Sequence, residues 1–333
     1  MSKIENLFNQ KLKSVYVVAE IGINHNGDVE IAKEMIEAAS RCGADAVKFQ
    51  TLTPDELFSK PTNPELFELS RDWVLSKNQH TILKKYAEKH NLDFFSTPFG
   101  NKSIKLLKDI KIKMLKIASS DMDNFDLISK SLDLHVPLIV STGMSTLAEI
   151  ATTVEFLKQK NANFLLLHCT SSYPSKIDDA NLSTIQYLKK TFSIPVGYSD
   201  HTLGNLACLT AVSLGASVLE KHFTLDKNMK GPDQKLSTDP KEFTNLIIDV
   251  KKIKKSLGTP RTIFTKSETN FRKNMRKSIA TKKLVKSGTK ISPSILCLIR
   301  PGTGISPKFL NNITGMTIKK DVKAGHLLSW TDF

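Results

Sequence analysis

Short apolar segments alternate with longer amphipathic segments between residue 15 and about residue 258. This alternation is typical of parallel strands that are joined by crossover helices. Helical patterns fall between the apolar segments, for example over residues 29–41, 77–90 and 147–158. The apolar segments predict eight strands, over residues 15–21, 46–50, 94–97, 114–118, 138–142, 164–169, 195–198 and 217–221. Eight strand and helix units in about 250 residues match the size of a (β/α)8 TIM barrel, and we predict this α/β fold.

A doubly wound open sheet is the alternative for the same alternation. That fold normally carries a glycine-rich phosphate-binding loop after its first strand. The sequence has no such loop at that place. The barrel is therefore the favoured interpretation.

The pattern changes after residue 258, where Gly258 and Pro260 interrupt the last predicted helix. We expect a barrel domain over residues 1–262 and a polar linker over residues 263–276. Residues 277–333 contain short, turn-rich apolar segments, which predict a small, mainly β domain. A domain below about 70 residues buries little surface by itself, so we expect it to dock on another surface.

The composition is that of a globular protein, with 40% hydrophobic and 24% charged residues in a chain of 333. No apolar run approaches the roughly 20 residues that a membrane span needs, and the first residues are polar, without a signal-peptide core. We therefore expect a cytoplasmic protein without a membrane partner. The four cysteines lie far apart and form no Cys-x-x-Cys pair, which favours reduced thiols.

The net charge of +15 is concentrated near the C-terminus. Residues 251–333 carry a net charge of +16, and the first 250 residues carry a net charge of −1. Aromatic residues that could stack on bases are scarce in this basic segment, so we expect no nucleic-acid partner. Two interpretations stay open: a lysine-rich solvated surface, or a cationic cover over a site for anionic substrates.

Polar residues end every one of the eight predicted strands. In a barrel of this kind the active site lies at the carboxyl ends of the strands, and the interior otherwise takes branched apolar residues. We therefore predict one site at these ends. The residues concerned are Glu20, Lys48, Gln50, Ser96, Thr97, Lys116, Ser119, Ser141, Thr142, residues 168–173, residues 199–201 and residues 220–222.

Two of these groups suggest specific chemistry. Lys48 and Lys116, together with nearby hydroxyl groups, suit phosphate and carboxylate oxygens; the alternative is a structural ion pair with Glu20 or Glu220. His201 and His222 stand on neighbouring strands and could bind one divalent cation. The alternative for each histidine is an ordinary hydrogen-bonded side chain. Glu20 and Glu220 could support the cation or act as a general base.

The sequence resembles the N-acetylneuraminate (sialic acid) synthases and their legionaminate and pseudaminate relatives over nearly its whole length. The resemblance rests on several motifs in the same order along the chain. They are residues 20–27 (EIGINHNG), 48–51 (KFQT), 96–99 (STPF), 141–144 (STGM), 168–174 (HCTSSYP), 199–202 (SDHT) and 220–224 (EKHFT).

This resemblance implies a reaction in which phosphoenolpyruvate, water and an open-chain N-acylated amino sugar give a sialic-acid-type acid and phosphate, with cleavage of a C–O bond. It implies a divalent metal, Mn²⁺ or Mg²⁺, on His201 and His222. The expected catalytic residues are Glu20, Lys48, Lys116 and Glu220. The expected phosphoenolpyruvate-binding residues are Lys48, Gln50, Thr97, Lys116, Ser119, Ser141 and Ser199. The expected sugar-binding residues are Asp121, Ser171, Tyr173, Asp233 and Arg300.

The C-terminal segment resembles the antifreeze-like (SAF, β-clip) domain of the same family. The resemblance implies a domain-swapped homodimer in which Arg300 reaches the active site of the partner. N-acetylmannosamine or a close relative is the expected sugar. The alternative is an N,N'-diacetyllegionaminate or pseudaminate synthase that uses a 2,4-diacetamido-trideoxy hexose. More distant alternatives are an aldolase with a Schiff base on Lys116 and a polyanion-binding protein.

Overall fold

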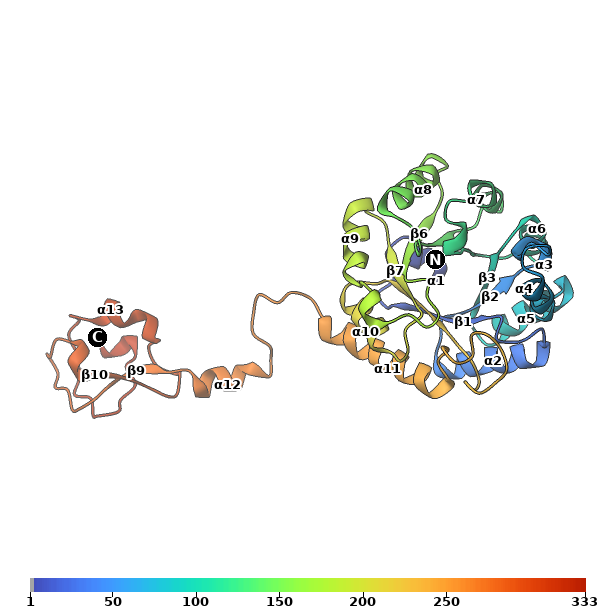
Figure 1. Ribbon diagram of the computed structural model, residues 1–333. Helices are drawn as coiled ribbons and strands as arrows, with labels where there is room; N and C mark the ends of the chain where they lie inside the picture. The colour runs from blue at the N-terminus through green and yellow to red at the C-terminus, as the bar shows by residue number, and fades with distance from the viewer. Residues whose placement is uncertain (1–2) are drawn as a thin grey trace. The chain divides into compact units, whose positions relative to one another are not determined.

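The computed structural model describes residues 3–333 and divides the chain into two compact units (Figure 1). The first unit ends at Gly258 and the second covers Thr259–Phe333.

The first unit is a closed barrel of eight parallel strands in the order of the sequence, with β1 paired to both β2 and β8. The predicted TIM barrel is confirmed, and each expected strand is present. The strands are β1 Tyr16–Gly22, β2 Ala46–Thr51, β3 Asp93–Pro98, β4 Leu115–Ile117, β5 Leu138–Ser141, β6 Phe164–Cys169, β7 Val196–Asp200 and β8 Val218–His222.

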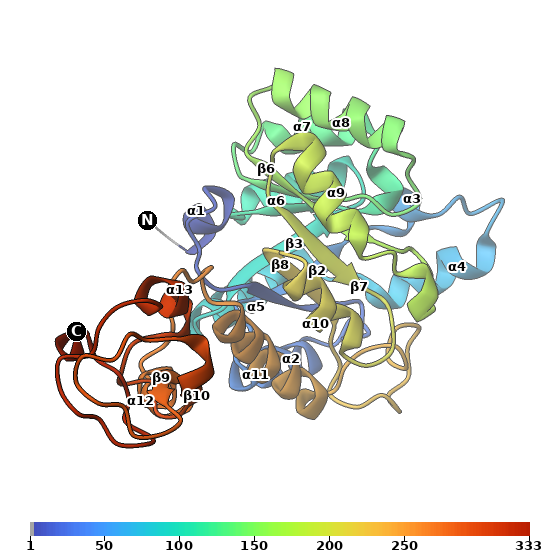
Figure 2. The same ribbon diagram turned by 90° about the vertical axis from the view of Figure 1, so that its left-hand side faces the viewer.

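Helices surround the strands and cover their outer faces (Figure 2). The helices between successive strands and after the last one are α2 Val29–Cys42, α5 Lys77–Lys89, α6 Asn101–Asp109, α7 Phe125–Leu132, α8 Leu147–Gln159, α9 Ser183–Phe192, α10 Leu206–Ser213 and α11 Pro240–Leu257. Side-chain caps determine where several of them begin. Asp28 accepts hydrogen bonds from the first turn of α2, and Ser76 and Thr146 form capping boxes on α5 and α8.

Short helices occupy the ends of the barrel and its loops. The helix α1 Lys3–Phe8 precedes the barrel, and α3 Pro54–Leu57 and α4 Pro64–Leu69 lie in the loop after β2. Trp73 in this loop packs on Ile23 and Leu52, which gives the loop a small apolar core of its own. The 3₁₀ helices of the barrel unit are η1 Ser70–Trp73, η2 Ser119–Asp121 and η3 Ile177–Asp179. The second unit contains η4 Pro293–Ile295, η5 Pro307–Phe309 and η6 Trp330–Asp332.

The second unit pairs two antiparallel strands, β9 Ser278–Thr281 and β10 Leu296–Ile299. It also contains α13 Leu310–Ile313 and a separate apolar core that includes Ile279, Ile305 and Leu328. The segment 263–276, which we expected to be a linker, contains the helix α12 Glu268–Met275. Within the described residues, no helix is both long enough and apolar enough to cross a membrane.

Candidate active site

The polar residues at the strand ends meet in one cavity of about 350 Å³ at the carboxyl ends of the barrel strands. The cavity brings together almost all of the predicted site residues. Asp121 and Arg300 are not among the residues that line it; Asp121 lies in η2, and Arg300 belongs to the second unit. The lining residues are Glu20, Lys48, Gln50, Thr97, Phe99, Lys116, Ala118, Ser119, Ser120, Ser141, Met144, Cys169, Ser171, Tyr173, Ser199, His201, Glu220, His222 and Asp233.

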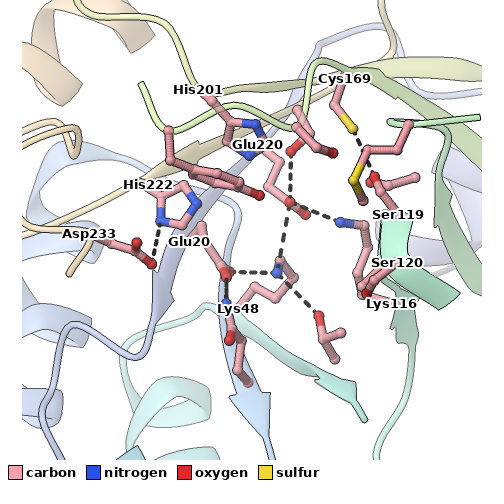
Figure 3. A pocket seen from close by; sticks show the side chains of 18 of the residues that line it. Glu20, Lys48, Lys116, Ser119, Ser120, Cys169, His201, Glu220, His222 and Asp233 are labelled. Carbon is pink, nitrogen blue, oxygen red and sulfur yellow. Dashed lines mark hydrogen bonds and ion pairs between the residues drawn. The ribbon is translucent and has the colours of Figure 1, made fainter. Parts of the chain in front are cut away.

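Two lysines and two glutamates form a continuous charge network in the floor of the cavity (Figure 3). The ammonium of Lys48 is 2.8 Å from Glu20 Oε2 and 3.8 Å from Glu220 Oε1. Lys116 donates to Glu220 Oε1 over 3.0 Å, and Ser199 donates to the same oxygen over 3.0 Å. All four charged side chains are buried. Both lysines are thus paired with carboxylates and face the cavity at the same time.

The two glutamates have opposite pKa shifts. Burial raises the pKa of Glu20 to about 7, against the lowering effect of Lys48. Burial also acts to raise the pKa of Glu220, but Lys116 and Lys48 outweigh it and hold this pKa at about 2. Burial acts to lower the pKa of Lys48, but Glu20 and Glu220 raise it above its ordinary value. Glu220 is therefore a permanent anion, and Glu20 can gain or lose a proton near neutral pH.

Hydroxyl groups line the cavity beside the lysines. Lys48 donates to Thr97 Oγ1 over 3.2 Å. The hydroxyl of Ser141 is buried and has no hydrogen-bond partner in the part of the chain that the structure describes. Ser119 Oγ accepts from the backbone N–H of Gly143 over 3.1 Å. An unpartnered hydroxyl that lines the same cavity as two ammonium groups is suited to an anionic oxygen.

The imidazoles of His201 and His222 face each other with ring centroids 5.5 Å apart. Nδ1 of His201 donates to the carbonyl of Thr170 over 2.7 Å, because a carbonyl can only accept. The lone pair of His201 is therefore on Nε2. Burial lowers the pKa of His201, and burial with the nearby His201 lowers the pKa of His222 well below its ordinary value. Both rings are thus neutral at pH 7, as metal ligands must be.

This donor set fits a divalent cation. A backbone carbonyl that holds the second nitrogen of the ring is the usual support of a metal-binding histidine, and Thr170 supplies it. Nδ1 of His222 is buried without a hydrogen bond, 3.7 Å from Asp233 Oδ2. Among residues 3–333, no group of three or more His, Cys, Asp or Glu side chains is arranged to hold a metal. Water or substrate oxygens would therefore complete the coordination of a cation.

The aromatic ring of Tyr173 lies beside both histidines. The ring of Tyr173 is 4.2 Å from that of His201, and its side chain is half exposed. Burial raises the pKa of Asp233 to about 6. Phe99, Ala118, Ser120 and Met144 also line the cavity and were not predicted from the sequence. Phe99 and Met144 lie within the strand-end motifs, but they carry no ionisable or hydroxyl group that would mark them.

The sequence model of the NeuB family matches residues 35–262. The chain belongs to the NeuB family. A SAF domain matches residues 276–333, so the family and the small domain expected from the motifs are both confirmed.

Members of the NeuB family similar to this chain include synthases of several acids. The chain is 39% identical to the N,N'-diacetyllegionaminic acid synthase of Legionella pneumophila, over 95% of this chain and 93% of the relative. It is 34% identical to a pseudaminic acid synthase of Campylobacter jejuni, over 96% of this chain and 97% of the relative. The solved N-acetylneuraminic acid synthetase of Leptospira borgpetersenii is 39% identical, with a TM-score of 0.74, and the match covers 78% of this chain and 90% of that one.

Proposed function

We propose that the protein is a sialic-acid-type synthase that joins phosphoenolpyruvate, water and an open-chain N-acylated amino sugar and releases phosphate. The observation that carries the proposal is the single cavity in which two lysines, two glutamates and two neutral histidines meet. The assigned activities of the similar family members support it.

Phosphoenolpyruvate carries a phosphate and a carboxylate, and the cavity offers a cation for each. The ammonium groups of Lys48 and Lys116 both approach Glu220 Oε1, at 3.8 and 3.0 Å. Their remaining N–H groups can turn to the ligand while Glu220 keeps them in place. Neutral donors would bind the other oxygens; they are Gln50, Thr97, Ser119, Ser141 and Ser199.

Glu20 is the proposed general base. Carbon 3 of phosphoenolpyruvate forms a bond with the aldehyde carbon of the sugar, and water adds to carbon 2. Glu20 accepts the proton that this water loses, and this proton balances the one that the aldehyde oxygen gains as it becomes a hydroxyl group. The C–O bond to phosphate then breaks, the departing phosphate takes the proton of the carbon-2 hydroxyl, and a keto group remains at carbon 2. A carboxylate with a pKa of about 7 is well matched to this step.

His201 and His222 would hold the divalent metal, Mn²⁺ or Mg²⁺. When bound, such a cation acts as a Lewis acid for the aldehyde oxygen. The chain itself supplies neutral imidazoles, and Thr170 fixes the orientation of the His201 ring. Asp233 lies next to His222 and can orient a hydroxyl group of the sugar.

Ser171, Tyr173 and Asp233 are the proposed sugar contacts on the barrel. Asp121, just outside the cavity, and Arg300 of the SAF domain are further candidates on the basis of the family resemblance. Arg300 would reach the site in a domain-swapped homodimer. A basic SAF domain next to a doubly anionic substrate would help to retain it.

Two sugars are candidates. N-acetylmannosamine is favoured by the similarity to the Leptospira N-acetylneuraminic acid synthetase, which is 39% identical. A 2,4-diacetamido-trideoxy hexose is favoured by the similarity to the Legionella N,N'-diacetyllegionaminic acid synthase, which is also 39% identical.

The test is phosphate release from phosphoenolpyruvate with Mn²⁺, measured in parallel with each sugar. Release with N-acetylmannosamine alone would identify a sialate synthase, and preference for a diacetamido sugar would identify the legionaminate or pseudaminate type. Absence of release with every sugar would contradict the proposal. Borohydride trapping with pyruvate tests the aldolase alternative, because only a Schiff base leaves a covalent adduct on Lys116.

A further inference from the structure

A buried ion pair joins β7 and β8 outside the cavity. The ammonium of Lys221 is 2.6 Å from Asp200 Oδ2 and donates to the carbonyl of Thr202 over 2.5 Å. The side chains of Lys221 and Asp200 are only 1% and 0% exposed. Neither residue lines the cavity, because side chains along a strand alternate between its two faces. This pair therefore has no direct access to a substrate.

Every oxygen of the Asp200 carboxylate is engaged. Oδ1 accepts from the hydroxyl of Tyr198 over 3.1 Å and from the backbone N–H of Thr202 over 2.9 Å. Oδ2 accepts from Lys221 and from the thiol of Cys208 over 3.2 Å. These donors come from β7, the loop after it, α10 and β8. The Asp200 carboxylate thus accepts hydrogen bonds from four separate segments of the chain.

The position of this pair relative to the histidines is specific. Asp200 and Lys221 are direct partners in the β7–β8 register and the last pair of that ladder. His201 follows Asp200 in the chain, and His222 follows Lys221. The ion pair therefore holds β7 and β8 together at the two residues that directly precede the histidines.

Stability alone does not explain the pair. Burying two charges costs about as much free energy as their attraction returns, and apolar replacements of buried ion pairs are often neutral or stabilising. The outer face of a barrel strand normally packs apolar side chains on the helices. A fully buried lysine and aspartate at this place therefore suggest a geometric role.

We propose that Asp200 and Lys221 are positioning residues that set the separation and orientation of the His201 and His222 rings for a divalent cation. The proposal rests on the proposed function, in which these two histidines hold the metal. It assigns no contact with substrate to either positioning residue.

The test is the double variant Asp200→Asn/Lys221→Met, which removes both charges but keeps a polar group for Tyr198 and Thr202. Mn²⁺ affinity is measured on the metal-stripped full chain without substrate, by electron paramagnetic resonance of free Mn²⁺. Loss of support behind metal ligands weakens binding by about 10–100-fold, and we expect a decrease in this range. Circular dichroism and gel filtration check the fold.

The matched control is Lys227→Met/Glu242→Gln, which removes a more exposed ion pair of 2.6 Å between the loop after β8 and α11. Its Mn²⁺ affinity should equal that of the wild type. Wild-type affinity in the folded Asp200→Asn/Lys221→Met variant would overturn the proposal. If that variant does not fold, Tyr198→Phe serves as the test, because it removes one hydrogen-bond donor to Asp200. We expect this variant to bind Mn²⁺ several-fold more weakly than the wild type. Unchanged Mn²⁺ affinity would reject the proposal.

A second readout separates this inference from the proposed function. Ring nitrogen signals of His201 and His222 are recorded by NMR on the metal-free proteins. We expect both to shift in the Asp200→Asn/Lys221→Met variant and not in the control. A wild type that binds no Mn²⁺ contradicts the proposed metal site, and unchanged ring signals in the variant contradict the positioning role.

Discussion

The Lys48 ammonium lies 2.8 Å from Glu20 and 3.8 Å from Glu220, and only one of these two glutamates is an anion at every physiological pH. Glu220 accepts from Lys116 and Ser199 as well, whereas Glu20 has Lys48 and the weaker donor Gln50, at 3.4 Å. The extra donors hold the pKa of Glu220 at about 2, and burial raises that of Glu20 to about 7. The same network therefore contains a fixed counter-ion and a group that can transfer a proton.

Replacing Glu20 by Gln should remove the general base with little change in shape. We expect kcat to fall by about 10²–10⁴-fold, the usual contribution of a positioned acid or base, while the KM for phosphoenolpyruvate changes little. Phosphate release measures both constants. The control Glu37→Gln removes a carboxylate on the surface helix α2. Wild-type kcat in Glu20→Gln would show that another group takes the proton.

The pH profile should report the same residue. Glu20 can accept a proton only when ionised, so kcat/KM should fall as the pH drops below about 7. Glu20→Gln should lose this dependence. Asp233, with a pKa of about 6, would act in the same direction, and Asp233→Asn separates the two contributions. A Glu20→Gln profile that keeps the wild-type midpoint would assign the titration to another group.

The strand-end pattern predicted most of the cavity because parallel strands in a barrel must bring their carboxyl ends together. The pattern does not distinguish strand-end residues that face the cavity from those that face the surrounding helices. It predicts Asp200 and Lys221 as part of the site, yet neither lines the cavity, because side chains along a strand alternate between its two faces. The sharing of Lys48 by Glu20 and Glu220 could not be predicted, because it depends on side-chain conformations across strands that are distant in sequence.

The apolar pattern of the sequence does not predict the helices α3 and α4. Each begins at a proline and is too short to be stable by itself. Packing against residues distant in sequence stabilises this loop, as the contact of Trp73 with Ile23 illustrates. Local periodicity carries no signal of such contacts.

Removal of a metal ligand should abolish metal-dependent turnover. We expect His222→Ala to lower Mn²⁺ affinity by at least about 100-fold and to leave the metal-free melting temperature close to that of the wild type. A Mn²⁺ titration, activity after chelation and thermal unfolding measure these effects. His90→Ala, at the partly exposed C-terminal end of α5, is the control. Full activity of the metal-stripped His222→Ala protein would end the metal assignment.

Gly143 is packed so closely that a methyl group should disturb the anion site. A Cβ there would lie 2.3 Å from Ser171 Oγ and 2.8 Å from both Cys169 Sγ and Ser119 Oγ. Overpacking of this kind costs about 1–3 kcal/mol, so Gly143→Ala should lower the melting temperature. Displacement of Ser119 should also raise the KM for phosphoenolpyruvate, by about tenfold for each 1.4 kcal/mol of lost binding.

The double variant Gly143→Ala/Ser171→Ala removes the oxygen nearest to the new methyl group. It should recover part of the lost stability and part of the phosphoenolpyruvate affinity. Equal KM values for the wild type and Gly143→Ala would show that Ser119 does not depend on this packing.

Mixing two inactive or impaired variants tests the proposed domain swap. Arg300→Ala should raise the KM for the sugar. Among residues 3–333, the one hydrogen bond of the Arg300 side chain runs from Nε to the carbonyl of Met275, so its other two nitrogens are available to a ligand. In a swapped dimer of Arg300→Ala with Glu20→Gln, one of the two sites combines an intact barrel with an intact SAF domain. Unfolding and refolding the two proteins together should therefore restore sugar turnover at low concentration above the sum of the separate samples. If each barrel used its own SAF domain, every site would keep one defect, and the mixture would equal that sum.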